Sequence, residues 1–193
     1  MNRICNKKFL GSKAAQSIVG GLLVVLVAVA VSSIATAQNK TDDDTVPLLK
    51  FKGGIGVIPV TGVAANGTVN LNVVRGVSPG APWRIADLRA EIGPDGHIQV
   101  VGRGLLLASG NGIGTNAGQS VHATLFCGSA ATATAHNSTV TGVALEADGD
   151  FRIDDFLSPA PPTPCDSPVL LIRNVGGVWF AAGIPLLHHE GRI

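Results

Sequence analysis

The densest group of side chains that could do chemistry in this sequence is a set of carboxylates around one turn. Glu146, Asp148, Asp150 and Asp154 lie on either side of Gly149. Calcium takes six to eight oxygen ligands, and acidic turns often supply them. The residues after Asp150 do not continue the EF-hand pattern. We therefore expect outward-pointing carboxylates that keep a hairpin soluble, with a calcium site as the alternative and no other cofactor.

A serine and three histidines form the second group of reactive side chains. The segment 118–122 reads Gly-Gln-Ser-Val-His, which lacks the second Gly of a nucleophile elbow. Ser120 and His122 share one face of a predicted strand, and we expect that face to meet solvent. His97, His122 and His136 are too far apart in sequence to predict a metal site. No catalytic residue is assigned, and a secreted hydrolase is the third hypothesis for function.

Two long loops carry the residues that we expect to contact a partner. The loop 109–119 is rich in Gly, and the loop 158–165 is rich in Pro. A strand is expected after the first loop, so it lacks the helix that a phosphate-binding loop requires. Loops on a rigid scaffold are common binding positions. The residues assigned to these two interaction loops are Asn111, Gly112, Thr115, Asn116, Pro161 and Pro162.

Two cysteines lie in the body of the chain. Cys127 and Cys165 are 38 residues apart, and no C-x-x-C pair is present. An even pair in an exported protein predicts a disulfide. The alternatives are two buried thiols or a metal pair, and no histidine next to either cysteine supports the metal pair.

Residues 1–37 have the three parts of a secretory signal. The start carries four Lys and Arg residues and no acid, an apolar run follows over 18–31, and 35–37 read Ala-Thr-Ala. The apolar run is shorter than the roughly 20 residues that cross a bilayer. We predict cleavage between Ala37 and Gln38 and export by the general secretory route, to the periplasm or beyond. The alternative is an uncleaved anchor, which would be the chain's one link to a membrane.

Composition bounds the remaining classes. Of 193 residues, 46% are apolar and 14% are charged, with a formal net charge of +1. This excludes a coiled coil and a disordered chain. Without residues 1–37, ten Lys and Arg remain against thirteen Asp and Glu, a net charge of −3. A nucleic-acid partner is therefore not expected.

Short strands separated by turn residues are the pattern of the body. Alternating apolar and polar residues over 88–92 and 120–127 have the period of two of a half-buried strand. Turn residues such as Pro94-Asp95-Gly96 separate neighbouring runs. We predict an all-β fold, an antiparallel sandwich or barrel-like domain of eight or nine strands over 53–187. A flexible lead-in over 38–52 precedes it and a tail over 188–193 follows. The expected strands are 55–60, 67–75, 83–92, 97–107, 120–127, 138–146, 151–157, 169–174 and 178–184.

The two tryptophans are expected to pack in the core and not to form a surface on which a sugar could stack. Trp83 and Trp179 lie in apolar surroundings, and we expect both in the core. The function predicted is an exported, non-catalytic interaction or structural module whose partner is an unidentified protein or glycan at or outside the cell surface. The alternative is a calcium- or carbohydrate-binding module that uses the acidic hairpin 146–155.

Overall fold

The structure, a computed structural model, describes residues 48–186. These residues contain thirteen β-strands. Those residues lie within one compact unit, Asp42–Ile193, and contain no helix long and apolar enough to cross a membrane. The expected signal, its cleavage site and the 188–193 tail lie outside the described residues. The strands are β1 (Leu49–Gly56), β2 (Val60–Val63), β3 (Val69–Leu71), β4 (Trp83–Arg84), β5 (Asp87–Ile92), β6 (His97–Arg103), β7 (Leu106–Leu107), β8 (Ser120–Cys127), β9 (Thr134–Asn137), β10 (Val143–Ala144), β11 (Phe151–Phe156), β12 (Val169–Asn174) and β13 (Trp179–Pro185).

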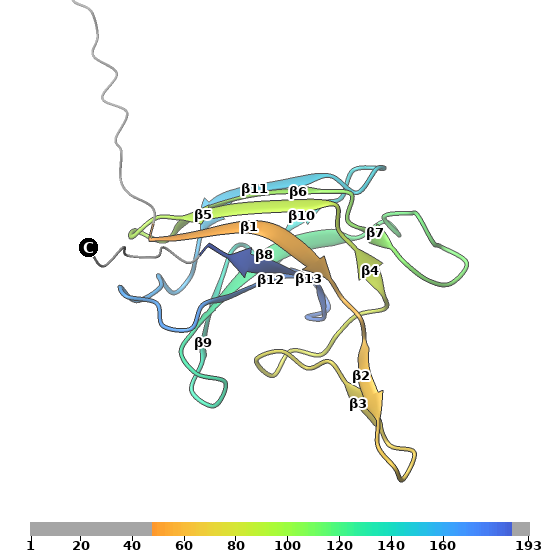
Figure 1. The fold of residues 1–193 in the computed structure, drawn as a ribbon. Helices are drawn as coiled ribbons and strands as arrows, with labels where there is room; N and C mark the ends of the chain where they lie inside the picture. Colours follow the sequence, from red (N-terminus) through yellow and green to blue (C-terminus); the bar gives the residue numbers. More distant parts are fainter. Residues whose placement is uncertain (1–47, 187–193) are drawn as a thin grey trace, which may run out of the picture. The chain divides into compact units, whose positions relative to one another are not determined.

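One antiparallel sheet contains most of these strands. Its order is β10-β8-β12-β13-β1-β5-β6-β11, and β9 pairs with β8 beside β10. The sheet curls until β10 and β11 approach each other, so the eight strands form a nearly closed barrel (Figure 1). Two small two-stranded sheets, β2-β3 and β4-β7, lie outside this path. The all-β, antiparallel, barrel-like fold expected from the sequence is confirmed.

Alternation along β5 and β6 shows how the sequence makes the wall of the barrel. Leu88 and Ile92 on β5 and Ile98 on β6 are fully buried, while Arg89 and Glu91 between them are exposed. Side chains of a strand alternate between the two faces of a sheet, so this pattern gives an apolar inside and a charged outside. The inward set fills one core; its main members are Phe51, Leu88, Ile92, Ile98, Val100, Val121, Leu125, Phe151, Ile153, Leu170 and Ile172.

The strands β8 and β12 differ because both of their faces are buried. Their inward residues belong to the core, and the outward side chains of His122, Thr124, Phe126 and Leu171 are also at most 5% exposed. The prediction that the Ser120–His122 face meets solvent is therefore wrong for His122. Alternation of apolar and polar residues along a strand separates its two faces, but it does not show whether another part of the chain covers the outer face.

Residues 57–82 leave the barrel after β1 and lie along the β12–β13 side of the sheet. The excursion starts where Val57 N–H donates to the carbonyl of Phe180, and it ends where Trp83 N–H donates to the carbonyl of Val57. Trp83 stacks on Phe180 with ring centroids 4.2 Å apart. Trp179 Nε1 donates to the carbonyl of Asn72. Both tryptophans are at most 4% exposed, as expected, so neither offers a surface for sugar stacking.

The first strand begins earlier than the sequence predicted. β1 covers 49–56, so residues 49–52 are not a flexible lead-in, and the expected strand 55–60 overlaps β1 only at its end. Lys50 and Lys52 resemble the polar residues of a linker, but they lie on the outer face of a strand whose Phe51 is only 2% exposed. A bulge between Phe51 and Gly54 lets the strand continue, and Gly53 takes its positive φ of 93°.

Three other expected strands are divided. The segment 138–146 holds a turn before β10, because Gly142 N–H bonds the carbonyl of Thr139. The expected strands 83–92 and 97–107 each break where the chain leaves the main sheet to form β4 and β7. In these places the run of β-forming residues is longer than the stretch that has a neighbouring strand to pair with.

The disulfide between Cys127 and Cys165 is present. It joins the end of β8 to the loop before β12, beside the hydrogen bond from Gly128 N–H to the carbonyl of Asp166. A closed loop of 38 residues stabilises the fold by about 4 kcal/mol in the chain-entropy model.

Substitution of Gly56 by Ala should destabilise the barrel by about 2 kcal/mol. A Cβ there would collide with the backbone carbonyl of Trp83, at the point where the excursion returns to β1. Gly62→Ala in β2 is the matched control, because a Cβ at Gly62 meets nothing within 4 Å. Urea unfolding of both variants measures the difference, and equal stabilities would show that the close approach at Gly56 is not a constraint.

Candidate functional site

The place where β10 faces β11 is the seam of the barrel. The two strands are joined by a turn in which Glu146 N–H bonds the carbonyl of Asp150. At the other end, Asn137 and Ser158 exchange two backbone hydrogen bonds of 3.0 and 2.8 Å. Because β10 has only two residues, the ladder between these closures is incomplete.

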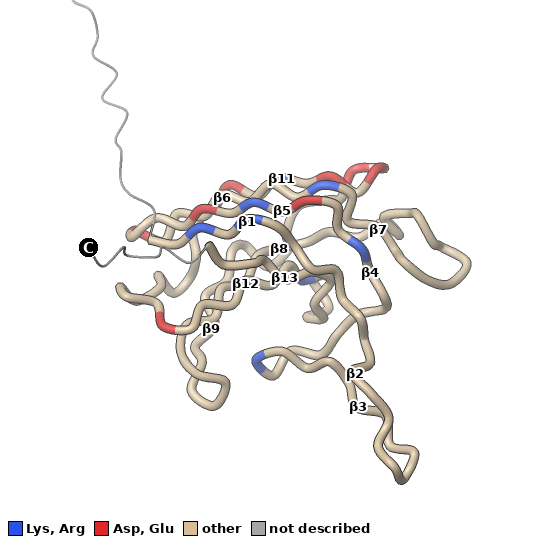
Figure 2. The backbone as a smooth tube through the Cα atoms, viewed as in Figure 1, with Lys and Arg blue, Asp and Glu red and all other residues tan. Residues whose placement is uncertain are grey.

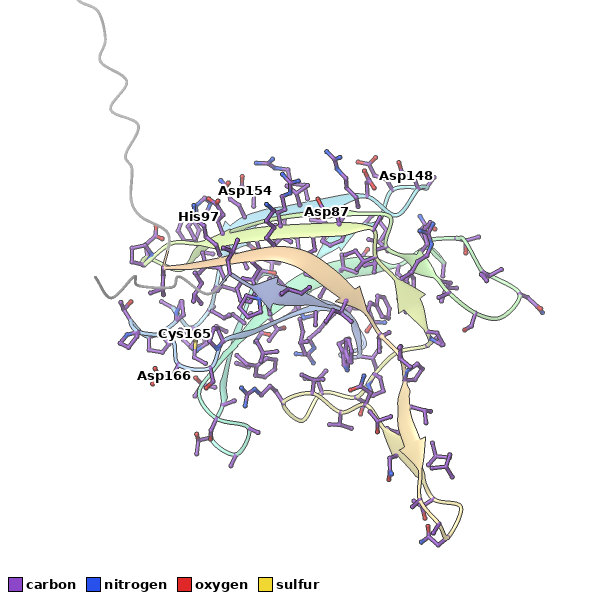
Figure 3. The ribbon with its side chains drawn as sticks, in the orientation of Figure 1. Asp87, His97, Asp148, Asp154, Cys165 and Asp166 are labelled. Atoms are coloured by element: carbon purple, nitrogen blue, oxygen red, sulfur yellow. A yellow bond between two sulfur atoms is a disulfide. The ribbon has the colours of Figure 1, made fainter. Side chains whose placement is uncertain are left out.

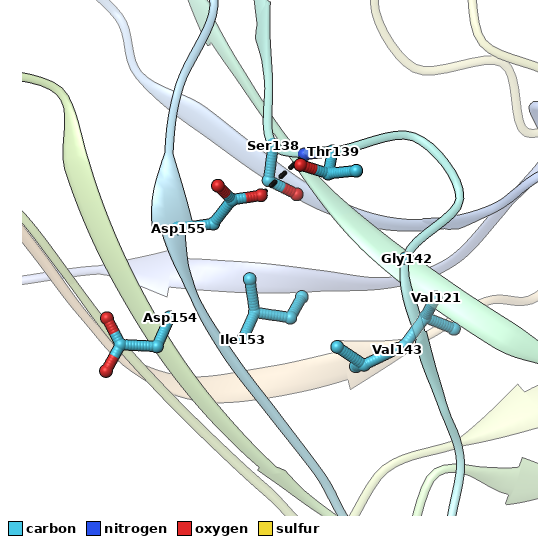
Figure 4. A pocket seen from close by; sticks show the side chains of 8 residues that line it. All are labelled: Val121, Ser138, Thr139, Gly142, Val143, Ile153, Asp154 and Asp155. Atoms are coloured by element: carbon cyan, nitrogen blue, oxygen red, sulfur yellow. Dashed lines mark hydrogen bonds between the residues drawn. The ribbon is translucent and has the colours of Figure 1, made fainter.

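A cavity of about 70 Å³ lies in this gap. Val121, Val143 and Ile153 give it an apolar wall, and Ser138 and Asp155 stand on its polar side (Figure 4). One water molecule requires at least about 10–15 Å³ of such space, so the cavity is large enough for a few waters. The seam is therefore the place where the barrel closes around a small, partly open pocket.

Asp155 holds the two sides of the seam together. Its Oδ2 accepts a 2.7 Å hydrogen bond from the backbone N–H of Thr139, and its Oδ1 accepts one from Phe156 N–H. The bond from Thr139 is the main reason why the pKa of this carboxyl lies below its usual value, against the opposing effect of burial. The charged form of Asp155 thus stabilises the closed barrel.

The side chain of Asp154, the residue before Asp155, points away from the cavity (Figure 4). Its Oδ1 lies 2.7 Å from Nε2 of His97, and its Oδ2 accepts a bond from Arg152. The hydrogen bond with His97 is the first cause of the lowered pKa of Asp154, and Arg152 adds to it. The His97 ring also packs against Phe156, with centroids 5.0 Å apart. This exposed pair belongs to the charged outer face.

The other carboxylates of the acidic hairpin have local partners. Asp150 accepts from the N–H of Gly104, and Asp148 accepts from the N–H of Asp150. Asp148 and Asp154 lie near opposite ends of β11 (Figure 3). Among residues 48–186, no three His, Cys, Asp or Glu side chains gather as a group that could hold a metal. The calcium site over Glu146, Asp148, Asp150 and Asp154 stays a prediction without a formed ligand group.

The two expected interaction loops lie at opposite ends of the barrel. The loop 109–119 follows β7, near the start of β11, whereas 158–165 follows the end of β11 (Figure 1). Asn116 donates to the carbonyls of Leu145 and Glu146, and Thr115 donates to the carbonyl of Gly112. In the second loop Pro161 is buried and Pro162 is exposed. Asn111 and Gly112 also belong to the first loop. Because the two loops lie at opposite ends, one small partner would not contact both.

Charge is divided unevenly between the two halves of the barrel. Lysines, arginines and acids gather on β1, β5, β6 and β11 (Figure 2). They form cross-strand pairs such as Lys50–Glu91 at 3.4 Å. By contrast, the segments 53–74, 104–145 and 174–186 contain no Asp, Glu, Lys or Arg. The β8–β9–β12–β13 side and the excursion are thus almost uncharged.

The hairpin β2–β3 exposes apolar side chains on the uncharged side. Its register pairs Val60 with Leu71 and Val63 with Val69, and a bulge at Thr61 brings all four onto one face. They are 40–64% exposed. This apolar face of the β2–β3 hairpin, with Ile58 and Val73 flanking it, is the largest group of exposed aliphatic side chains in the described residues.

Arg173 on β12 lies directly opposite His122 on β8. The guanidinium donates twice to the carbonyl of Gly177 and once to Oγ1 of Thr124. Burial lowers the pKa of Arg173, and burial together with the Arg173 charge lowers the pKa of His122. His122 is therefore held neutral, and its Nδ1 has no hydrogen-bond partner among the described residues.

Comparison with models of known protein families, with curated proteins and with solved structures finds no match to this chain. Its function must therefore be inferred from its own residues. Sequence reasoning missed three features: Asp155 at the seam, the apolar hairpin face and Arg173. A signal for the hairpin was available, because Val60, Val63, Val69 and Leu71 lie in a long segment without charge.

Replacing Asp155 by Asn should make the free energy of unfolding depend less on pH in the acidic range. Because the folded pKa is lowered, the carboxylate stabilises the protein above about pH 4 and loses that effect as the pH falls through the folded value. The variant should be less stable than wild type near neutral pH, and the difference should shrink as the pH falls below about 4. Urea unfolding across pH measures this, with the exposed Asp166 changed to Asn as control. A difference that persists in acid would contradict the role of the charge.

Proposed function

We propose that this chain is a non-catalytic interaction module that works outside the cytoplasm and assembles with a second copy of itself through the apolar face of the β2–β3 hairpin. Export is supported by the basic start, the apolar run and the Ala-Thr-Ala exit of residues 1–37. A disulfide within the barrel is in keeping with an oxidising compartment.

The observation that carries the proposal is the exposure of four aliphatic side chains on one face of a small sheet. Val63 is 64% exposed and Leu71 is 54% exposed. The opposite face carries Thr61, whose hydroxyl bonds the carbonyl of Asn70. Both faces of the hairpin are exposed and its aliphatic side chains gather on one of them, whereas a hairpin that serves only its own fold turns that face toward the core.

An isolated two-stranded hairpin has little stability in water, and both of its edges are open to pairing. Natural proteins protect such edges with charges or Pro at the exposed positions. Pro59 precedes this hairpin, but residues 53–74 contain no charged residue. A surface with this composition is stabilised when a second apolar surface covers it.

A second copy is the occupant that fits this surface best. The face carries no charge, so two identical faces do not repel each other and no oppositely charged partner is selected. Two antiparallel hairpins can pack face to face about a two-fold axis, which pairs the same residues on both sides.

Val63→Lys should weaken self-association by at least about tenfold, because each dimer would bury two unpaired charges in an apolar contact. Sedimentation velocity over a range of protein concentrations measures the monomer–dimer equilibrium. Val175→Lys is the matched control, since Val175 is 70% exposed and belongs to the β12–β13 turn, outside the hairpin. A wild-type protein that stays monomeric up to about 1 mM, or equal effects of the two variants, would refute assembly through this face.

A further inference from the structure

We propose that Arg173, together with His122, forms a binding site for one oxyanion group, a carboxylate or a phosphate, on the outer side of β8 and β12. This site is independent of the hairpin proposed for self-association. Its members come from paired strands, because Arg173 is the register partner of His122 and Leu171 that of Thr124.

The charge of Arg173 has no counter-ion in the described part of the chain. No carboxylate of residues 48–186 lies within 4.0 Å of its guanidinium, and Arg173 differs from the other arginines without an acidic partner there in that burial lowers its pKa. Its three hydrogen bonds all go to neutral oxygens, those of Gly177 and Thr124. A half-buried cation without an anion is costly, and an oxyanion offsets that cost.

Arg173 also keeps donors for a ligand. A guanidinium has five N–H groups, and the three bonds to Gly177 and Thr124 leave two of them. The bonds to Gly177 fix the plane of the group, so the free N–H on Nη1 and the free N–H on Nη2 are already oriented before a ligand arrives. Planar bidentate pairing with carboxylate or phosphate is the interaction for which such an arginine is suited.

His122 is the second and independent indication of a ligand. Its side chain is 3% exposed, and its Nδ1 is buried without a partner. A buried nitrogen without a hydrogen bond costs roughly 1–3 kcal/mol. Because the imidazole is held neutral beside Arg173, the tautomer protonated at Nδ1 can donate to an anion without adding a second charge.

The surroundings favour an anion over a cation. Thr124, which is fully buried, donates to Oδ1 of Asn137 at 2.8 Å and accepts from Arg173. The segments 104–145 and 174–186, which contain β8, β9 and β13, hold no acid. The field of Arg173 is therefore not cancelled locally, and low solvent exposure weakens its screening.

The test is a titration of the ¹⁵N-labelled protein with inorganic phosphate, and in a second arm with acetate, at ionic strength held constant by sodium chloride. The Nε–H signal of Arg173 and the ring nitrogens of His122 report binding. We expect saturable shifts of both, with a midpoint of about 1 mM, typical of one or two charge-assisted hydrogen bonds. Preference for phosphate or for acetate identifies which oxyanion the site takes.

Arg173→Gln should weaken binding by at least about tenfold, while Arg75→Gln should leave it unchanged within about twofold. Arg75 is the matched control because it is also partly buried and bonds a backbone carbonyl, that of Ser167. If Arg173→Gln does not fold, His122→Phe keeps the shape and removes the donor, and should also weaken binding. Shifts that do not saturate, or that survive Arg173→Gln, would overturn the site and leave Arg173 as a brace for the turn 174–177.

Discussion

Closure of the sheet between β10 and β11 is the constraint on which the rest of the structure depends. An open antiparallel sheet leaves two rows of unpaired N–H and C=O groups, and curling it into a barrel removes them only if the last strands meet. Here they meet through a turn at one end, the Asn137–Ser158 bridge at the other and Asp155 between them. One carboxylate bonded to Thr139 replaces the ladder that the short β10 cannot provide.

Closure also explains why the two halves of the barrel differ in charge. The interior takes one face of every strand, so the outer face of each strand must meet either water or a second cover. Strands β1, β5, β6 and β11 meet water and carry paired charges. Strand β8 and the middle of β12 are buried on both faces, with the excursion 57–82 along this side of the sheet, whereas Arg173 near the end of β12 stays partly exposed. The β2–β3 hairpin is the part of that excursion that extends beyond the barrel (Figure 1).

The sequence was sufficient for the fold class and for the elements with clear local signals. The ranges expected for β8 and β12 match the structure, and the Cys127–Cys165 bridge followed from the cysteine count. The sheet order was not predictable, since β1 lies between β13 and β5, far apart in the chain. The same limit hid the candidate sites. Asp155 matters because of Thr139, and Arg173 because of His122, and neither pairing leaves a trace in local composition.

Arg173 and the seam are connected by a continuous series of hydrogen bonds. The guanidinium donates to Thr124, the hydroxyl of Thr124 donates to the side chain of Asn137, and the backbone of Asn137 pairs with Ser158 to close the barrel. Polar groups in such a series orient one another, because each donor fixes the geometry of the next acceptor. An oxyanion on Arg173 would therefore bind a guanidinium that is already oriented, at one end of a series that leads to the closure of the barrel.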